Sequence, residues 1–169
     1  MRFSLRGATN ADAARCSEMV VLATPWDVTA LVARGLASEL DGKTVVSMAN
    51  PLVRSNSEQH ALLLPRGSVA AHVQAAVPTA RVVAALHHVP TRQLASVDQR
   101  IAADVLVCGD DEGAVELVCA MLAGIPGCRA LNAGQLSNAC AIEAFTGVLR
   151  QLDERYKTEV APWFCGIDR

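Results

Sequence analysis

Three short segments that follow predicted buried strands are the candidates for chemistry in this sequence. They are Thr24-Pro25-Trp26, Asn50-Pro51-Leu52 and His87-His88-Val89-Pro90. In an open α/β sheet, ligands bind beyond the carboxyl ends of the strands, so these segments would meet at one cleft. The predicted binding residues are Thr24, Pro25, Trp26, Asn50, Pro51, Leu52, His87, His88 and Pro90.

Several common chemistries lack their sequence signals. No two glycines are separated by a single residue, so the phosphate-binding pattern G-x-G-x-x-G does not occur, and the P-loop and G-x-S-x-G patterns are also absent. His60 and His72 are isolated, and adjacent His87 and His88 would point in different directions if their backbone is extended. The sequence therefore predicts no metal site, and it assigns no catalytic residue.

Composition and charge restrict the partners. The 169 residues carry a net charge of −2 and no run of like charge, which excludes the electrostatic pattern of a nucleic-acid binder. No apolar stretch reaches the roughly 20 residues of a membrane span, and no secretory signal is recognised, so we expect a cytoplasmic chain. The six cysteines contain no C-x-x-C pair and are expected to be reduced and mostly buried, with Cys165 the best candidate for an exposed thiol.

Short apolar runs alternate with helical patterns along the chain. Residues 19–23 predict a buried strand, and Thr24 suits the N-cap of a helix that would begin at Pro25 and run to about Leu40. Residues 43–48 predict the next strand. A strand, a helix and a second strand in this order form a β-α-β unit, which produces parallel pairing.

The rest of the chain continues the alternation. A long connection is expected from Asn50 to Arg66. The further predicted elements are a helix at 68–76, a strand at 81–86, a loop at 87–98, a strand at 104–108, a helix after Asp111, a strand at 128–131 and a helix at 136–152. This order predicts an α/β fold with a doubly wound sheet and flanking helices.

Five stretches, in order, resemble one family. They are residues 10–14, 20–26, 83–90, 104–111 and 132–138, and the likeness extends from about residue 5 to 152. Together they resemble the coenzyme F420-dependent NADP reductases. The resemblance implies hydride transfer between NADPH and the deazaflavin F420, with both coenzymes in one cleft. The resemblance implies that Thr24-Pro25-Trp26 borders the nicotinamide. Asn50-Pro51-Leu52 and His87-His88-Val89-Pro90 would border the deazaflavin, where His87 would form a hydrogen bond with a ring carbonyl or a phosphate.

The sequence departs from the family pattern at its start. Family members begin with a strand, a glycine-rich turn, a helix and a second strand, and here residues 2–7 already resemble the third strand or the connection after it. The resemblance therefore implies a truncated Rossmann-like domain at residues 1–152, followed by a tail at 153–169. NADP binding is expected to be weak or lost.

The same departure predicts an exposed sheet edge. The strand between Met19 and Ala23 would lack its usual neighbour, and an unpaired apolar edge is a template for association. We expect a homodimer through this edge, or a partner chain that supplies the missing half, with pairing through residues 2–7 as a further option. The alternatives to an active oxidoreductase are a non-catalytic dimeric scaffold or partner subunit and a reductase fold repurposed for non-redox small-molecule chemistry.

Overall fold

The computed structural model describes residues 6–56, 58–95 and 100–167. Its main sheet has five strands in the order β1-β2-β5-β6-β7. Strands β1, β2 and β5 are parallel to one another, β6 is antiparallel to β5, and β7 is parallel to β6. The bounds are β1 (Met19–Leu22), β2 (Thr44–Ser47), β5 (Arg81–Ala84), β6 (Ala103–Gly109) and β7 (Cys128–Asn132).

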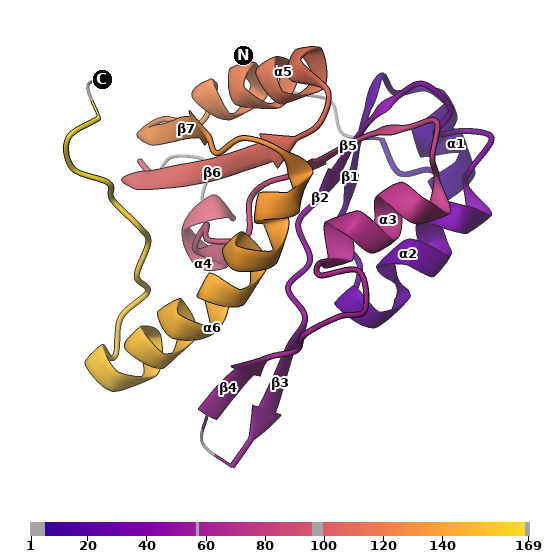
Figure 1. Cartoon of the computed structure of the whole chain (residues 1–169). Helices are drawn as coiled ribbons and strands as arrows, with labels where there is room; N and C mark the ends of the chain where they lie inside the picture. Colours follow the sequence, from indigo (N-terminus) through magenta and orange to yellow (C-terminus); the bar gives the residue numbers. More distant parts are fainter. Residues whose placement is uncertain (1–5, 57, 96–99, 168–169) are drawn as a thin grey trace.

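Helices cover the sheet, and a separate hairpin projects from it. The helices are α1 (Asn10–Arg15), α2 (Trp26–Gly35), α3 (Val69–Ala76), α4 (Thr91–Leu94), α5 (Glu112–Ala123) and α6 (Ala139–Tyr156), with the short 3-10 helix η1 (Leu136–Asn138) before α6. Strands β3 (Leu52–Ser55) and β4 (Glu58–Ala61) form an antiparallel hairpin. In Figure 1 the hairpin extends below the main sheet beside α6, α2 and α3 lie together, and α5 lies over β6 and β7.

Alternate residues of the central strands enter two core clusters. The first core cluster joins the sheet to α2, α3 and the start of α6, and the second joins it to α5. Members of the first include Leu22, Leu36, Val45, Val73, Val82, Ala84 and Ile142; members of the second include Val46, Val83, Ala85, Leu86, Val105 and Val118. Because neighbouring residues such as Val45 and Val46 point to opposite faces, β2 is buried on both sides.

The doubly wound α/β fold predicted from the alternation is confirmed, and two details of α2 are corrected. The N-cap is Pro25, without a side-chain bond, because the Thr24 hydroxyl instead lies 2.9 Å from that of Thr29. The helix ends at Gly35, and the chain reaches the buried Leu40 through turns.

Two predicted connections contain structure that the sequence did not indicate. The segment from Asn50 to Arg66 includes the β3–β4 hairpin, and the loop at 87–98 includes the single turn α4, while residues 96–99 lie outside the described residues. The predicted helix at 136–152 is η1 followed by α6, which continues to Tyr156 and so passes the expected domain boundary at residue 152. Most of the 2–7 segment also lies outside the described residues.

The segment after α6 is held to the sheet by a buried ion pair. Asp104 of β6 accepts two bonds of 2.7 Å from the guanidinium of Arg129 on β7. The same carboxylate accepts from the backbone N–H of Phe164, and Arg129 also donates to the carbonyls of Phe164 and Ile167. This network fixes the tail along the outer strands, where Figure 1 shows it in yellow.

The cysteines are free thiols, and only part of the prediction for them holds. Cys165 is exposed as expected. The expected burial of most cysteines is wrong, because Cys119, Cys128 and Cys140 are half-buried and Cys16 is exposed. Cys108 is buried, and burial raises the pKa of its thiol to about 12, with the carboxylate of Glu143 adding to the shift. Such a thiol stays protonated at neutral pH and acts as a small apolar side chain.

Candidate functional site

Asn50, His87 and Thr146 form a hydrogen-bonded cluster where β2 and β5 end. The amide oxygen of Asn50 lies 3.1 Å from Nδ1 of His87 and accepts a bond of 2.9 Å from the hydroxyl of Thr146 on α6. The amide nitrogen of Asn50 donates to the backbone carbonyl of His87 at 3.4 Å. Since β2 and β5 are neighbouring parallel strands, the fold brings these two predicted site residues together as the sequence indicated.

The cluster fixes the protonation of His87. The Asn50 oxygen can only accept, so Nδ1 carries the proton and Nε2 is left as an acceptor. Burial, and next the neighbouring His88, lowers the pKa of His87 to about 3, although a contact with the backbone of Met48 opposes the shift. The ring is therefore neutral at physiological pH. Its buried Nε2 makes no hydrogen bond of normal geometry with the described residues, so it can accept one from a ligand.

His88 is turned toward α6 and serves the packing. Its Nε2 lies 2.7 Å from the carbonyl oxygen of Ile142, and its ring meets Phe145 edge-on at 5.3 Å between centroids. Burial lowers the pKa of His88 as well. Both histidines thus face partners on or beside α6, and their rings are tilted by 57°, because the backbone before them is not extended. Within the described ranges no cluster of three or more potential metal ligands occurs.

The segment Thr24-Pro25-Trp26 follows β1. Because β1, β2 and β5 are parallel, this segment lies at the same end of the sheet as Asn50 and His87. Its hydrogen bonds are local: the hydroxyl of Thr24 pairs with Thr29. Trp26 is half-buried and packs against the first core cluster. The strand order therefore places Thr24-Pro25-Trp26 at the same end of the sheet as the Asn50–His87–Thr146 cluster. The side-chain contacts of this segment, however, are with α2 and the first core cluster.

The prolines and Leu52 give the site a rigid backbone. The carbonyl of buried Pro51 accepts from Leu62, across the base of the hairpin, and that of buried Pro90 accepts from Leu94 of α4. Leu52 begins β3 and packs near Gly147 of α6. A cavity of about 20 Å³, the size of a single water, lies between the two histidines, Pro90 and α6.

Sequence reasoning missed Thr146. It lies on α6, 96 positions from Asn50, and its sequence signal is a polar residue on a mostly apolar helix face. Glu143, one turn earlier, was missed for the same reason. Its carboxylate is 1% exposed and accepts from the backbone N–H groups of Val69 and Ala70 at 2.8 and 3.0 Å.

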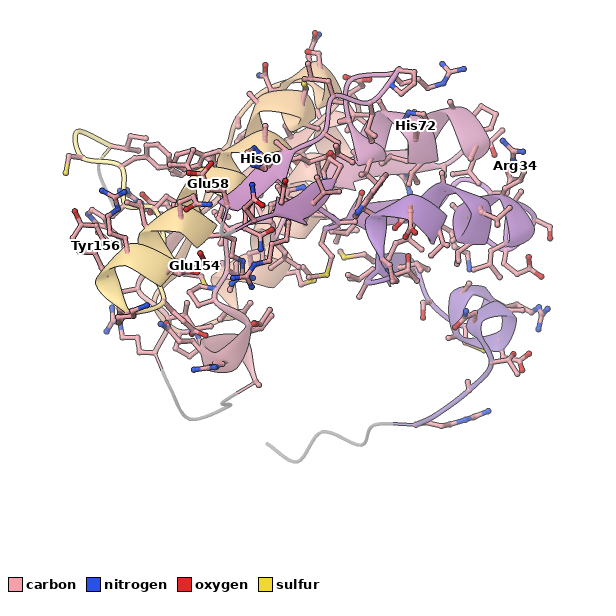
Figure 2. All side chains as sticks on the ribbon, turned by 90° about the horizontal axis from the view of Figure 1, so that it is seen from below. Arg34, Glu58, His60, His72, Glu154 and Tyr156 are labelled. Carbon is pink, nitrogen blue, oxygen red and sulfur yellow. The ribbon has the colours of Figure 1, made fainter. Side chains whose placement is uncertain are left out.

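Helix α6 contacts α3 through Glu143 and the hairpin through Glu154. Glu143 joins α6 to the start of α3, and burial raises the pKa of its carboxyl to about 7 against the opposing effect of the two N–H donors. On the outside, Arg54 of β3 pairs with Glu154 at 3.5 Å. Figure 2 shows Glu58 and His60 of β4 on this side of the molecule, beside α6.

The fold and this site define a Rossmann-like α/β protein in which Asn50, His87 and Thr146 gather where β2 and β5 end. Comparison with known proteins narrows the class. Residues 2–51 match the family model described as NADP oxidoreductase, coenzyme F420-dependent. The F420-dependent NADP reductase of Methanocaldococcus jannaschii is 37% identical over 155 residues, which cover 90% of this chain and 70% of that protein. The reductase of the same name from Methanothermobacter thermautotrophicus is 28% identical over 94% of this chain and 70% of its own length.

Structural comparison agrees. The crystal structure of a proposed F420-dependent NADP reductase from Arthrobacter sp. FB24 superposes with a TM-score of 0.81 at 25% identity, over 96% of this chain and 74% of that one. A hypothetical protein from Sinorhizobium meliloti shares the fold, with a TM-score of 0.66 at 23% identity, over 80% of this chain and 65% of its own. The chain belongs to the F420-dependent NADP reductase family and is an oxidoreductase-like protein. No helix in the described part of the chain is long and apolar enough to cross a membrane.

Proposed function

We propose that this chain binds coenzyme F420, and NADP more weakly, at the ends of β1, β2 and β5. When both are bound, the two coenzymes supply the hydride transfer, and the protein supplies the positioning. Family membership supports the choice of coenzymes. The observation that carries the site is the Asn50–His87–Thr146 cluster at the strand ends, in which the buried Nε2 of His87 has no hydrogen-bond partner among the described residues. A buried polar atom of this kind is costly unless a ligand satisfies it.

The residues of the cluster have separate tasks in this proposal. His87 accepts a hydrogen bond through Nε2, so its ligand partner is an N–H or O–H group rather than the carbonyl or phosphate that the sequence suggested. Asn50 and Thr146 hold the ring through Nδ1. His87 remains neutral and gives no proton, in agreement with a direct hydride transfer. Pro51 and Pro90 keep the surrounding backbone fixed.

The remaining predicted residues form the walls of the proposed cleft. Thr24, Pro25 and Trp26 border the nicotinamide side, and Leu52 and His88 complete the deazaflavin side. NADP is held weakly by these residues alone, because no G-x-G-x-x-G turn is present to bring backbone N–H groups to a pyrophosphate. A partner chain that contributes such a turn would restore tight NADP binding.

The test is an absorbance titration of the purified chain with F420. The wild type is expected to bind in the micromolar range. His87→Leu should bind about tenfold more weakly, since leucine has no acceptor and one hydrogen bond of about 1.4 kcal/mol is lost. His72→Leu is the matched control, because His72 on α3 also has a buried ring nitrogen without a partner among the described residues. No binding of wild type at high micromolar F420, or equal weakening in both variants, would contradict the proposed site.

We further propose that the chain works as a homodimer through β1, with a partner chain as the other option. Val21 is 40% exposed on this outer strand. A groove of about 380 Å³ runs along β1 between α1 and α2, and residues of the first core cluster, including Ala14 and Leu36, line it. An apolar edge strand that opens onto the core favours pairing with another strand.

Light scattering tests the assembly. Wild type is expected to have the mass of a dimer, and Val21→Lys should convert it to a monomer. Leu31→Lys, on the exposed face of α2, is the control and should remain dimeric. A monomeric wild type would refute the homodimer and direct the search to a partner chain.

A non-catalytic scaffold is the second candidate function. It is favoured by the open β1 edge. The two functions differ in one measurement, the F420-dependent oxidation of NADPH by the purified chain. Turnover above the rate without protein would exclude the scaffold.

A further inference from the structure

The backbone at Leu86 is in a conformation that leucine rarely adopts. Its φ is +68°, in the left-handed region, where a side chain with a Cβ is strained. Leu86 lies between the end of β5 and His87, and it is only 9% exposed. Strain of this kind persists only where the surroundings enforce it, and it is concentrated at functional sites.

The left-handed residue reverses the alternation of side chains along the chain. Val83 enters the second core cluster and Ala84 the first, as expected for a strand. Ala85 and Leu86, although consecutive, both enter the second cluster. In a continued strand His87 would share the face of Val83 and Ala85, so it would point toward the second cluster and away from α6.

The reversal is what places His87 in the polar cluster. After Leu86 the ring of His87 meets Asn50, and its backbone carbonyl lies 3.4 Å from the hydroxyl of Thr146 on α6. The leucine side chain belongs to the second core cluster, as do Val46, Val83 and Val89, and its burial there compensates for the strained φ. A weak turn bond of 3.5 Å, from the N–H of Val89 to the carbonyl of Leu86, closes the reversal.

We propose that Leu86 is a positioning residue of the coenzyme site, whose left-handed backbone turns His87 from the core toward Asn50 and Thr146. The conformation, rather than the side chain as such, orients the ring. For coenzyme binding this inference rests on the function proposed above, but the orientation of His87 can be measured without any coenzyme.

Substitutions at Leu86 separate conformation from packing. Leu86→Gly and Leu86→Ala remove almost the same packing, but glycine adopts a positive φ freely while alanine does not. Leu86→Val keeps most of the apolar volume but adds a branched Cβ, which the left-handed region tolerates least. Leu36 provides the control, because it is equally buried at 9% but has a φ of −115°.

The first readout is the titration of the histidine rings by NMR, with His87→Gln used to assign the signal. In wild type and Leu86→Gly, His87 should stay neutral down to about pH 4, in keeping with its pKa of about 3. In Leu86→Val and Leu86→Ala the released ring should titrate near the ordinary value of about 6.5. Leu36→Val should leave the His87 titration unchanged.

Two further readouts complete the test. Thermal melting should rank Leu86→Gly above Leu86→Ala, and the order of the same two substitutions at Leu36 should be the reverse. The affinity for F420 should stay within about threefold of wild type in Leu86→Gly and fall at least tenfold in Leu86→Val. If Leu86→Val does not fold, the glycine and alanine variants decide by the same titration.

The outcomes distinguish this inference from the proposed function. A neutral His87 in Leu86→Val or Leu86→Ala, or a titrating His87 in Leu86→Gly, overturns the positioning role. Failure of wild type to bind F420 overturns the proposed function, but the ring titrations still decide whether Leu86 orients His87.

Discussion

Replacing Glu143 by glutamine should reveal an unusual pH dependence of stability. The carboxylate of Glu143 accepts from the N–H groups of Val69 and Ala70, and the hydroxyl of Ser68 accepts from Ala71, so the first three N–H groups of α3 are satisfied by side chains. Burial nevertheless raises the pKa of Glu143 from 4.5 to about 7. The folded protein therefore binds a proton at Glu143 more readily than the unfolded chain does.

The sign and size of the effect follow from this difference. A raised carboxyl pKa stabilises the fold below pH 4.5, and the contribution is lost as the pH rises through 7. About 2.5 pKa units correspond to about 3 kcal/mol of the free energy of unfolding. Solvent does not screen this interaction appreciably, because Glu143 is 1% exposed. Glutamine resembles the protonated acid, with one acceptor for the two N–H groups, and it does not titrate.

The assay is urea denaturation of wild type and Glu143→Gln at pH 5, 6, 7 and 8. The two proteins should differ by less than about 1 kcal/mol at pH 5, and the variant should become the more stable by about 3 kcal/mol at pH 8. The difference between them is the useful quantity, because the lowered pKa of His87 acts in the opposite direction. The contribution of His87 to the free energy of unfolding is lost as the pH falls from 6.5 toward 3, and this loss is the same in both proteins.

Glu154→Gln is the control for this experiment. Glu154 lies on the same helix but in a surface ion pair with Arg54, and such a pair contributes at most about 1 kcal/mol. Its replacement should leave the pH profile parallel to that of wild type. A Glu143→Gln profile that is also parallel, or that falls relative to wild type as the pH rises, would refute the reasoning, because the two N–H donors would then outweigh burial.

Further substitutions test other parts of the structure. Gly147→Ala should raise the free energy of unfolding in urea by about 0.5–1 kcal/mol, because a Cβ there meets its neighbours at 3.5 Å or more inside a helix; a loss of stability would contradict this. Gly127→Ala should cost at least about 1–3 kcal/mol in the same assay, since φ is +90° and the Cβ would lie 2.6 Å from a carbonyl oxygen. Thr146→Val should cost about 1 kcal/mol and weaken F420 binding in the absorbance titration; unchanged affinity would argue against its role. Arg129→Ala should free the tail, measured as faster proteolysis and a shifted Trp163 fluorescence, whereas a protected tail would show that the ion pair is not what holds it.

The β3–β4 hairpin was not predicted from the sequence, although one residue in it carries a recognisable signal. Its strands carry few of the β-branched and aromatic residues by which strands are recognised. The available signal was Asn56, which has a φ of +55° in the hairpin turn, since asparagine tolerates this conformation better than most residues. The hairpin is stable because it packs on α6, a contact between segments about 90 residues apart that no local pattern records.

The antiparallel direction of β6 is indicated more clearly by the sequence of the connection that precedes it. Parallel strands need a crossover of a dozen or more residues, usually a helix, whereas antiparallel strands do not. Among the described residues between β5 and β6 the one helix is the four-residue α4, and the sequence there has Pro90 and no helical periodicity. The lack of a helical pattern in this connection therefore favours the antiparallel pairing of β5 and β6 that the structure shows.

One part of the candidate site follows from local sequence patterns, and another part depends on contacts between distant residues. The position of Asn50 and His87 follows from strand ends, because parallel neighbours bring their carboxyl ends to one edge, and this part could be predicted. The orientation of His87 could not, because it depends on one backbone angle at Leu86, and that angle is stable only through the packing of a distant cluster. Thr146 reaches the same two residues from α6, nearly 60 positions beyond His87. Which groups gather at the site is thus set by topology, but which atom of His87 is left for a ligand is set by long-range packing.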